Sequence, residues 1–114
     1  MQKSPSPYIH YIINAVALIR DFLEDIDKSE FKKNNLVQAA TIRQLEIIGE
    51  ACNNLEEKFK QSRPNIPWQL IIGMRNKLAH DYWDIDIDLV WKTAKKDAPV
   101  LQKQLLDLLS EIGK

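Results

Sequence analysis

The stretch Ile87–Ile112, IDLVWKTAKKDAPVLQKQLLDLLSEI, decides the fold. Its apolar residues recur in alternating steps of four and three, at Ile87, Trp91, Ala94, Ala98, Leu101, Leu105, Leu108 and Ile112. This periodicity predicts one long helix whose continuous apolar seam packs inside a helical bundle. Asp86 is predicted to cap the first turn. Pro99 is predicted to kink or interrupt the helix, because proline lacks a backbone donor.

Three earlier segments show the same helical period. The segment from Tyr8 to about Asp27 has an apolar stripe wide enough to pack on two sides. The next segment is a long helical pattern in which Gly49 marks a close approach of another helix or of a second copy of the chain. The four expected helices span about residues 8–27, 35–60, 67–80 and 87–112, after a loose lead-in at residues 1–7. We therefore expect a single all-α domain over residues 1–114, an up-and-down bundle of four main helices.

The composition limits the compartment and the class of partner. Sixteen basic and sixteen acidic residues cancel, which argues against a bulk electrostatic nucleic-acid binder but leaves room for a local basic cleft. The single Cys52 points to a reducing compartment. The apolar stretch from Tyr8 to Ile19 is too short to span a bilayer, and no signal-peptide pattern precedes it. We expect a cytoplasmic protein without a membrane partner.

The segment Gly73–Tyr82, GMRNKLAHDY, is the candidate site. His80 is one of only two histidines, with Arg75 five residues before it and Tyr82 two residues after it. Residues five apart lie about 140° from each other on a regular helix, so Arg75 and His80 cannot share one face. Either the helix ends or distorts near His80, or two copies of the chain combine their residues. A homodimer with these helices facing each other across a two-fold axis satisfies the second condition.

These residue types suit cleavage of a phosphate ester. Arg75 can bind a phosphate with two parallel hydrogen bonds and stabilise its charge in the transition state. A histidine titrates near neutral pH, so His80 can take the proton of a ribose 2′-hydroxyl and return one to the leaving oxygen. Asn76 can orient either group. The alternative is structural: His80 closes a helix end, and Arg75 pairs with a carboxylate of another helix.

A second polar face precedes this segment. Arg43, Glu46, Gly49 and Glu50 recur at helical spacings of three and four. Two carboxylates one turn apart fit a metal site or an acid–base pair, but pairing with Arg43 or exposure to water is the more ordinary reading. No second histidine or cysteine lies nearby in the sequence to complete a metal shell. We expect no metal and no cofactor, and we take Arg43, Glu46, Glu50 and Lys77 as candidate walls of the cleft.

The blocks around the candidate site resemble the HepT family, the small ribonuclease toxins of the HEPN superfamily. The resemblance is carried by residues 39–51 (AATIRQLEIIGEA), Ile66-Pro67-Trp68, residues 71–76 (IIGMRN), His80-Asp81-Tyr82 and Val90-Trp91. It covers nearly the whole chain from Tyr8 onward. The ordered set of blocks is far more specific than the arginine–histidine spacing alone.

The resemblance implies a HEPN-like bundle that dimerises to form a composite site, and a metal-independent endoribonuclease that acts as the toxin of a toxin–antitoxin pair. The family motif, Arg-x4-His-x-Tyr, falls on Arg75, His80 and Tyr82, with Asn76 as the polar residue after the arginine. The family's partner is an MntA-like nucleotidyltransferase antitoxin that transfers AMP to the motif tyrosine, here Tyr82. The chain departs from the usual pattern at Ala79 and Asp81, which we interpret as tuning.

Two other functions stay open from the sequence. One is a non-catalytic helical dimer that serves as binding partner or substrate of a nucleotidyltransferase. The other is a helical dimerisation domain in which Arg75 and His80 only stabilise the fold. The first predicts modification of Tyr82 without toxicity, and the second predicts that alanine at Arg75 or at His80 destabilises the fold.

Overall fold

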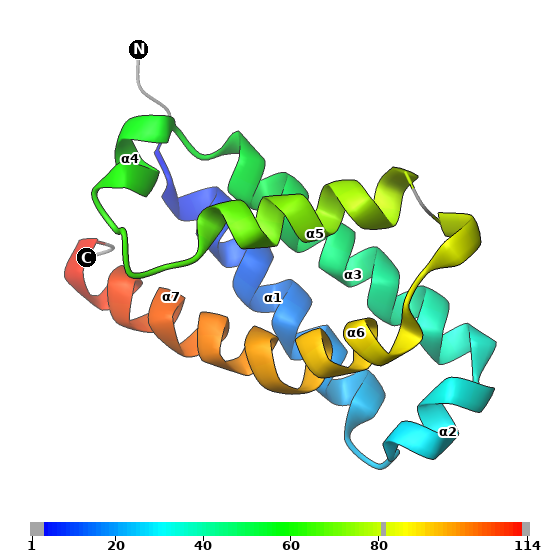
Figure 1. Cartoon of the computed structure of the whole chain (residues 1–114). Coiled ribbons are helices and arrows are strands. Elements are labelled where there is room, and N and C mark those ends of the chain that lie inside the picture. Colours follow the sequence, from blue (N-terminus) through cyan, green and yellow to red (C-terminus); the bar gives the residue numbers. More distant parts are fainter. Residues whose placement is uncertain (1–3, 81, 113–114) are drawn as a thin grey trace.

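The computed structural model describes residues 4–80 and 82–112, and within them the side chains of all residues except Ala79, His80, Tyr82 and Ile112. All regular elements of these residues are helical. In chain order they are α1 (Ser6–Leu23), α2 (Lys28–Lys33), α3 (Asn35–Asn54), α4 (Glu57–Gln61), α5 (Trp68–His80), the 3-10 turn η1 (Tyr82–Asp84), α6 (Ile87–Lys92), the π-helical segment η2 (Thr93–Asp97) and α7 (Ala98–Ile112). The expected all-α bundle of four main helices is confirmed, with α6, η2 and α7 forming the fourth (Figure 1).

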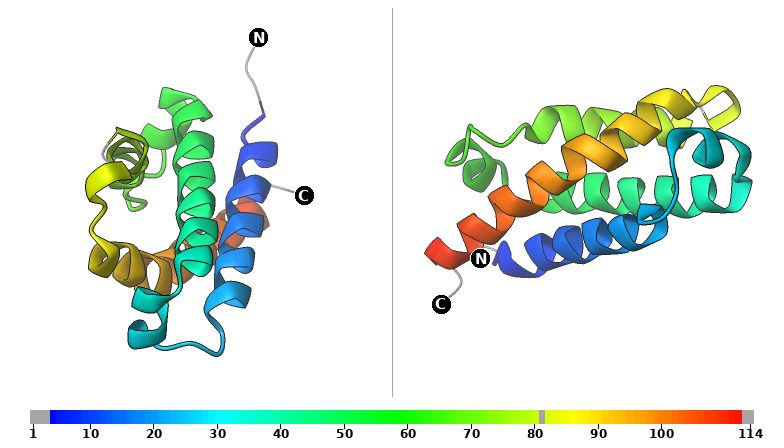
Figure 2. Two further views of the ribbon diagram at one scale, coloured as in Figure 1. Left: turned by 90° about the vertical axis from the view of Figure 1, so that its right-hand side faces the viewer. Right: turned by 90° about the horizontal axis from the view of Figure 1, so that it is seen from below.

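Helix α1 packs on two sides, as its wide stripe predicted. It lies against α3 on one side and against α7 on the other, and Figure 2 shows the three helices side by side. The face that α1 turns inward is almost fully buried and consists of Ile9, Ile12, Val16, Ile19 and Leu23. Burying each side chain of this size stabilises the fold by about 1.5–3 kcal/mol relative to exposure. The helix begins two residues earlier and ends four residues earlier than the sequence predicted.

The prediction of one helix from residue 35 to 60 is wrong beyond Asn54. Leu55 adopts an extended backbone conformation while its side chain stays buried, and its N–H bonds to the carbonyl of Cys52. Lys60 returns from α4 to the same place, where its buried ammonium donates to the Cys52 carbonyl at 3.1 Å. A cation suits the carbonyl end of a helix, so this contact stabilises the break. Leu55 and Phe59 continue the helical spacing of Leu45, Ile48 and Cys52, and both still reach the core across the break.

The short helix α2 was missed by the periodicity because it has only one buried side chain, Phe31. Its signal was local. Asp27 accepts a hydrogen bond from the backbone of Glu30, while Glu30 accepts one from the backbone of Asp27, which together form a capping box. The Phe31 ring packs on Trp91 with the ring centres 5.2 Å apart. This contact ties α2 to α6.

The long C-terminal helix absorbs its proline without breaking. Asp86 caps α6 as predicted, its carboxylate accepting from the backbone N–H of Leu89 at 3.2 Å. The π-helical segment η2 ends two residues before Pro99, and the N–H of Ala98 bonds to the carbonyl of Thr93 five residues back. One wider turn accommodates the proline ring and the lost donor while the apolar seam continues through Leu101 and Leu105.

No helix among the described residues is both long enough and apolar enough to cross a membrane.

Candidate functional site

Helix α5 is fastened to α3 by buried side chains along one face. Trp68 is 5% exposed, and its indole N–H donates to the carbonyl of Arg63 at 3.1 Å. Its ring packs against Phe59, and Ile72 and Leu78 continue the buried face toward the end of the helix. Helix α5 begins at Trp68, one residue after the predicted start at Pro67. The carbonyl of Pro67 accepts a hydrogen bond from the backbone N–H of Ile71. The inner face of α5 is therefore fixed, and its polar residues lie at its edges and outside.

The base of the Arg75 side chain lies where α3 and α5 cross in close contact. A methyl group added to Gly49 would lie 2.6 Å from Cγ of Arg75 and even closer to its Cβ. Any side chain at position 49 would therefore displace the base of the arginine. The sequence predicted that Gly49 marks a close approach, and the structure assigns that approach to α5 of the same chain. This packing sets where the guanidinium group emerges.

The guanidinium group of Arg75 is held by two oxygen atoms. It donates to the amide oxygen of Asn76 at 2.9 Å, and it lies 3.7 Å from a carboxylate oxygen of Glu50. The Arg75 side chain is 31% exposed and that of Glu50 is 45% exposed, so water reaches both. The ion pair is loose for a charge-assisted hydrogen bond, and a guanidinium has five donors. Donors of Arg75 thus stay available for an anion.

The rest of the polar face on α3 is paired in its own way. Arg43 lies 3.8 Å from Glu46, with the arginine side chain 60% exposed and the glutamate 25% exposed. The two carboxylates at positions 46 and 50 thus each have a cation, but the cation for Glu50 comes from α5. Lys77 is exposed on a different side of α5, where it borders a small hollow beside Asp84. The structure therefore brings Arg43, Glu46, Glu50 and Arg75 to one wall and leaves Lys77 outside it.

The motif histidine stands at the end of its helix. Helix α5 ends at His80 and the 3-10 turn η1 begins at Tyr82. The side chains of His80 and Tyr82, and the whole of Asp81, lie outside the described part of the structure. The predicted roles of these residues therefore stay predictions. Arg75 and His80 belong to one regular helix and are five residues apart, which places them about 140° from each other around its axis. A single copy thus does not present both side chains from one helix face.

No group of three potential metal ligands occurs among the residues that the structure describes. Cys52 is the buried cysteine of α3, and burial raises the pKa of its thiol to about 12, against a smaller opposite effect of the Lys60 ammonium. The thiol is therefore neutral and enclosed at physiological pH. It does not take part in the site.

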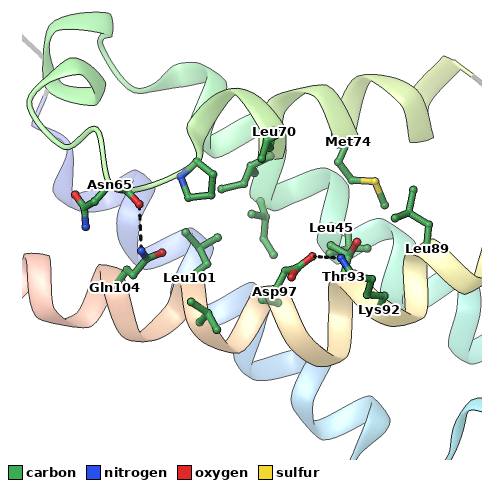
Figure 3. Close-up of a pocket in the computed structure, with 15 residues that line it drawn as sticks. Leu45, Asn65, Leu70, Met74, Leu89, Lys92, Thr93, Asp97, Leu101 and Gln104 are labelled. Atoms are coloured by element: carbon green, nitrogen blue, oxygen red, sulfur yellow. Dashed lines mark hydrogen bonds and ion pairs between the residues drawn. The ribbon is translucent and has the colours of Figure 1, made fainter.

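An apolar hollow of about 640 Å³ lies beside α5 and was not predicted from the sequence (Figure 3). Leu45 and Ile48 of α3 form part of its wall, and Leu70 and Val100 border it at 77% and 59% exposure. Gln104 donates to the carbonyl of Asn65 across one end. The available signal in the sequence was that Leu70 falls outside the helical spacing that joins Ile71, Met74 and Leu78. The structure leaves Leu70 exposed, and an exposed leucine beside buried residues marks a surface that contacts something else.

The fold and the polar wall define a small helical bundle with an arginine held at a helix crossing and a histidine at the end of the same helix. The family described as Ribonuclease HepT-like matches residues 12–108. The chain belongs to this family, which confirms the resemblance read from its sequence, and it is a ribonuclease by family.

Three relatives agree with this assignment. A protein of Thermococcus cleftensis named as a probable ribonuclease HepT is 41% identical over 90% of this chain and 93% of its own length. A candidate RNase of Methanocaldococcus jannaschii is 39% identical over 91% of this chain and 95% of its own. A candidate RNase of Caldanaerobacter subterraneus is 35% identical over 96% of this chain and 97% of its own. No solved structure matches the chain.

Proposed function

We propose that the protein is a metal-independent endoribonuclease whose site is completed by a second copy of the chain. The observation that carries this proposal is the position of Arg75. The guanidinium is fixed by the crossing at Gly49, is oriented by Asn76 and keeps donors for a phosphate. A preorganised cation is the group that stabilises charge in phosphoryl-transfer transition states. Arg75 lies on α5, the helix that ends at His80.

The proposed reaction uses only groups of the chain and of the RNA. His80 takes the proton from a ribose 2′-hydroxyl, and the 2′-oxygen attacks the adjacent phosphorus. The bond from phosphorus to the 5′-oxygen of the next nucleotide breaks, and the imidazolium returns the proton to that leaving oxygen. Arg75 stabilises the negative charge on the phosphate oxygens during the attack. The products are a 2′,3′-cyclic phosphate end and a 5′-hydroxyl end, and no water is consumed.

Two surface features support a second copy. An added methyl group at Gly73 would meet nothing within 4 Å, so the outer face of α5 offers room for another helix. The hollow beside α5 combines a concave apolar wall with protruding side chains at Leu70 and Val100. A two-fold interface needs such a self-complementary surface, because each copy supplies both the protrusion and the hollow. In this arrangement two arginines and two histidines meet, and each Arg75 can act with the partner's histidine.

The proposed biological role is that of a toxin controlled by a nucleotidyltransferase partner. In this proposal the hydroxyl oxygen of Tyr82 attacks the α-phosphorus of ATP, pyrophosphate leaves, and AMP becomes bound to the tyrosine. Tyr82 lies two residues after His80, so the added phosphate occupies the place of the RNA phosphate near Arg75. Negative charge beside the site would also repel RNA. Modification would thus turn cleavage off without changing the fold.

The nuclease is tested with His80→Ala on total RNA and tRNA in the presence of EDTA. We expect the wild type to leave 2′,3′-cyclic phosphate ends and His80→Ala to lose activity by a factor of 10² or more. The exposed His10 on α1 provides the matched control, since His10→Ala removes the other histidine without touching the site. Equal cleavage by wild type and His80→Ala would disprove the proposal.

The regulation is tested by co-expression with a nucleotidyltransferase antitoxin. Tyr82→Phe lacks the acceptor oxygen, so we expect it to stay toxic where the wild type becomes harmless. Tyr11→Phe on α1 is the control, because Tyr11 is 58% exposed and distant from the motif in the sequence. If the wild type is modified on Tyr82 but never cleaves RNA, the protein is the substrate of its partner and not a nuclease.

A further inference from the structure

An exposed tryptophan follows the motif directly. The chain has three tryptophans: Trp68 is 5% exposed, Trp91 is half-buried against Phe31, and Trp83 is 84% exposed. A large apolar side chain that is mostly exposed forgoes part of the free energy that its burial would contribute. Large exposed aromatic rings therefore tend to mark a binding surface.

The turn that carries Trp83 is anchored on both sides. Before it, Leu78 in the last turn of α5 is buried in the core. After it, Ile85 packs against the core, and Asp86 caps α6 through the N–H of Leu89. The 3-10 turn η1 also contacts α5. The described residues on either side of Trp83 are thus held by the core and by a helix cap, while the Trp83 side chain itself is largely exposed.

The acidic residues that follow Trp83 do not make this surface repel RNA. Asp88 lies 3.2 Å from Lys28 and 3.4 Å from Lys32, and hydrogen bonds from these lysines lower its pKa. Asp86 caps the positive end of α6. Asp84 borders the same small hollow as the exposed Lys77. Asp88 is therefore offset by two lysines and Asp86 by a helix end, which reduces the negative charge that an approaching phosphate meets.

We propose that Trp83 is a stacking platform for a base of the RNA strand next to the cleaved linkage. Trp83 lies three positions after His80, so their Cα atoms are at most about 11 Å apart. Single-stranded RNA is commonly held by unstacked bases lying on aromatic rings, and this contact tolerates any base. The ring would hold the strand in register while Arg75 takes the phosphate. This inference rests on the proposed nuclease function, but it can fail or hold separately from it.

The first test measures binding without cleavage. The probe is a fluorescein-labelled single-stranded RNA in which every 2′-hydroxyl is methylated, so that the attack cannot begin. We expect Trp83→Ala to weaken binding on the order of tenfold or more, and Trp83→Phe to retain most of the affinity. Leu36 on α3 is 80% exposed, so Leu36→Ala controls for the loss of an exposed apolar side chain. Equal affinity of wild type and Trp83→Ala would overturn the inference.

The second test locates the stacked base. A set of the same RNAs, each with one base removed, is bound to the wild type and to Trp83→Ala. We expect removal at one position beside the cleaved linkage to weaken wild-type binding about as much as Trp83→Ala does, and the two losses not to add. If the losses add at every position, the ring does not stack on a base. If Trp83→Ala instead reduces self-association and leaves RNA affinity unchanged, the ring is a protein contact and the inference is wrong.

Cleavage of unmodified RNA separates this inference from the proposed function. If the wild type cleaves and Trp83→Ala cleaves with an unchanged KM, the nuclease stands and the stacking fails. If the wild type binds the methylated RNA through Trp83 but does not cleave unmodified RNA, the stacking stands and the nuclease fails. The support that we expect is a KM raised by on the order of tenfold in Trp83→Ala, with kcat changed by less than about threefold.

Discussion

The two glycines of the crossing helices stand in opposite surroundings. The space beside Gly49 on α3 is filled by the Arg75 side chain of α5, so a methyl group at position 49 has no room. Gly73 on α5 has nothing within 4 Å of the position where a methyl group would lie. Both residues weaken their helices by about 1 kcal/mol relative to alanine. The crossing between α3 and α5 is thus completed by the chain itself, while the outer face of α5 is left open.

This difference shows which helix contacts one copy of the chain completes by itself and which contacts it leaves open. The inner crossing fixes the arginine, and the chain compensates the cost of Gly49 by the close packing that this residue allows. No contact within the described part of the chain compensates the cost of Gly73. A second helix that packs on the exposed backbone at Gly73 would compensate this cost, and our proposed dimer has that arrangement. The comparison therefore predicts different kinds of damage from the same substitution at the two positions.

The largest effect is expected from Gly49→Ala. The added methyl group pushes Arg75 away from the crossing, and overpacking of this kind costs about 1–3 kcal/mol, partly offset by the better helix propensity of alanine. A catalytic group displaced by about 1 Å can lose a factor of 10² in rate. We expect RNA cleavage to fall by about that factor in a protein that still folds, as measured by single-turnover kinetics and thermal unfolding.

Gly73→Ala is the matched control for that substitution. In a single copy its methyl group enters open space, so we expect the free energy of unfolding of the monomer, measured at a protein concentration too low for self-association, to rise by about 0.5–1 kcal/mol. A loss of folding stability at position 73 as large as that at position 49 would mean that the two glycines do not differ in the way the crossing suggests.

The next largest effect is expected from Gly73→Leu, which tests the open face. A leucine there projects into the space that we assign to the second copy, so self-association should weaken by tenfold or more, with cleavage lost in parallel at low protein concentration. The monomer should keep its helical content. The measurements are sedimentation equilibrium, circular dichroism and activity as a function of concentration. A dimer of unchanged affinity would place the interface elsewhere.

Much of the fold followed from helical period alone. The seam of the C-terminal helix needs only the spacing of apolar residues, and Ala94, Leu101 and Leu105 are buried where that spacing put them. Boundaries were harder to predict. The end of α3 depends on Lys60 returning to the carbonyl of Cys52, a contact between residues eight apart that no periodicity contains.

The candidate site was predictable as a set of residue types but not as a geometry. The sequence left open which carboxylate of another helix pairs with Arg75. Among the described residues the structure pairs Arg75 with Glu50, while Arg43 pairs with Glu46. Which carboxylate pairs with Arg75 depends on the relative position of α3 and α5. Gly49 makes their close packing possible, but its presence in the sequence does not specify that position. The hollow at Leu70 was missed for the same reason, since its walls come from three separate stretches of the chain, residues 45–48, 65–74 and 89–104.

A smaller effect comes from Cys52, three residues after Gly49 on the closed side of the comparison. Its thiol has a pKa of about 12 in the folded protein and about 8.5 when unfolded. The folded form keeps its proton longer, so stability is unaffected below about pH 8 and falls as the pH rises from about 8.5 toward 12. Between pH 8 and pH 9.5 we expect the wild type to lose about 1 kcal/mol relative to Cys52→Ala in urea unfolding. Comparing the two proteins cancels the titration of lysines and tyrosines, and an unchanged difference would show that the thiol is reached by water.

The smallest effect is expected from Glu50→Gln, which removes the charge that holds Arg75 against the closed side. The pair is loose and its members are 31% and 45% exposed, so its loss should cost less than about 0.5 kcal/mol of stability. The arginine then loses a competing anion while Asn76 still orients it at 2.9 Å. We expect KM for RNA to fall about two- to threefold at low salt and this gain to disappear at high salt, where surface charges are screened. An increase in KM would instead show that Glu50 positions Arg75 for the phosphate, which would make the ion pair part of the machinery and not a competitor for the substrate.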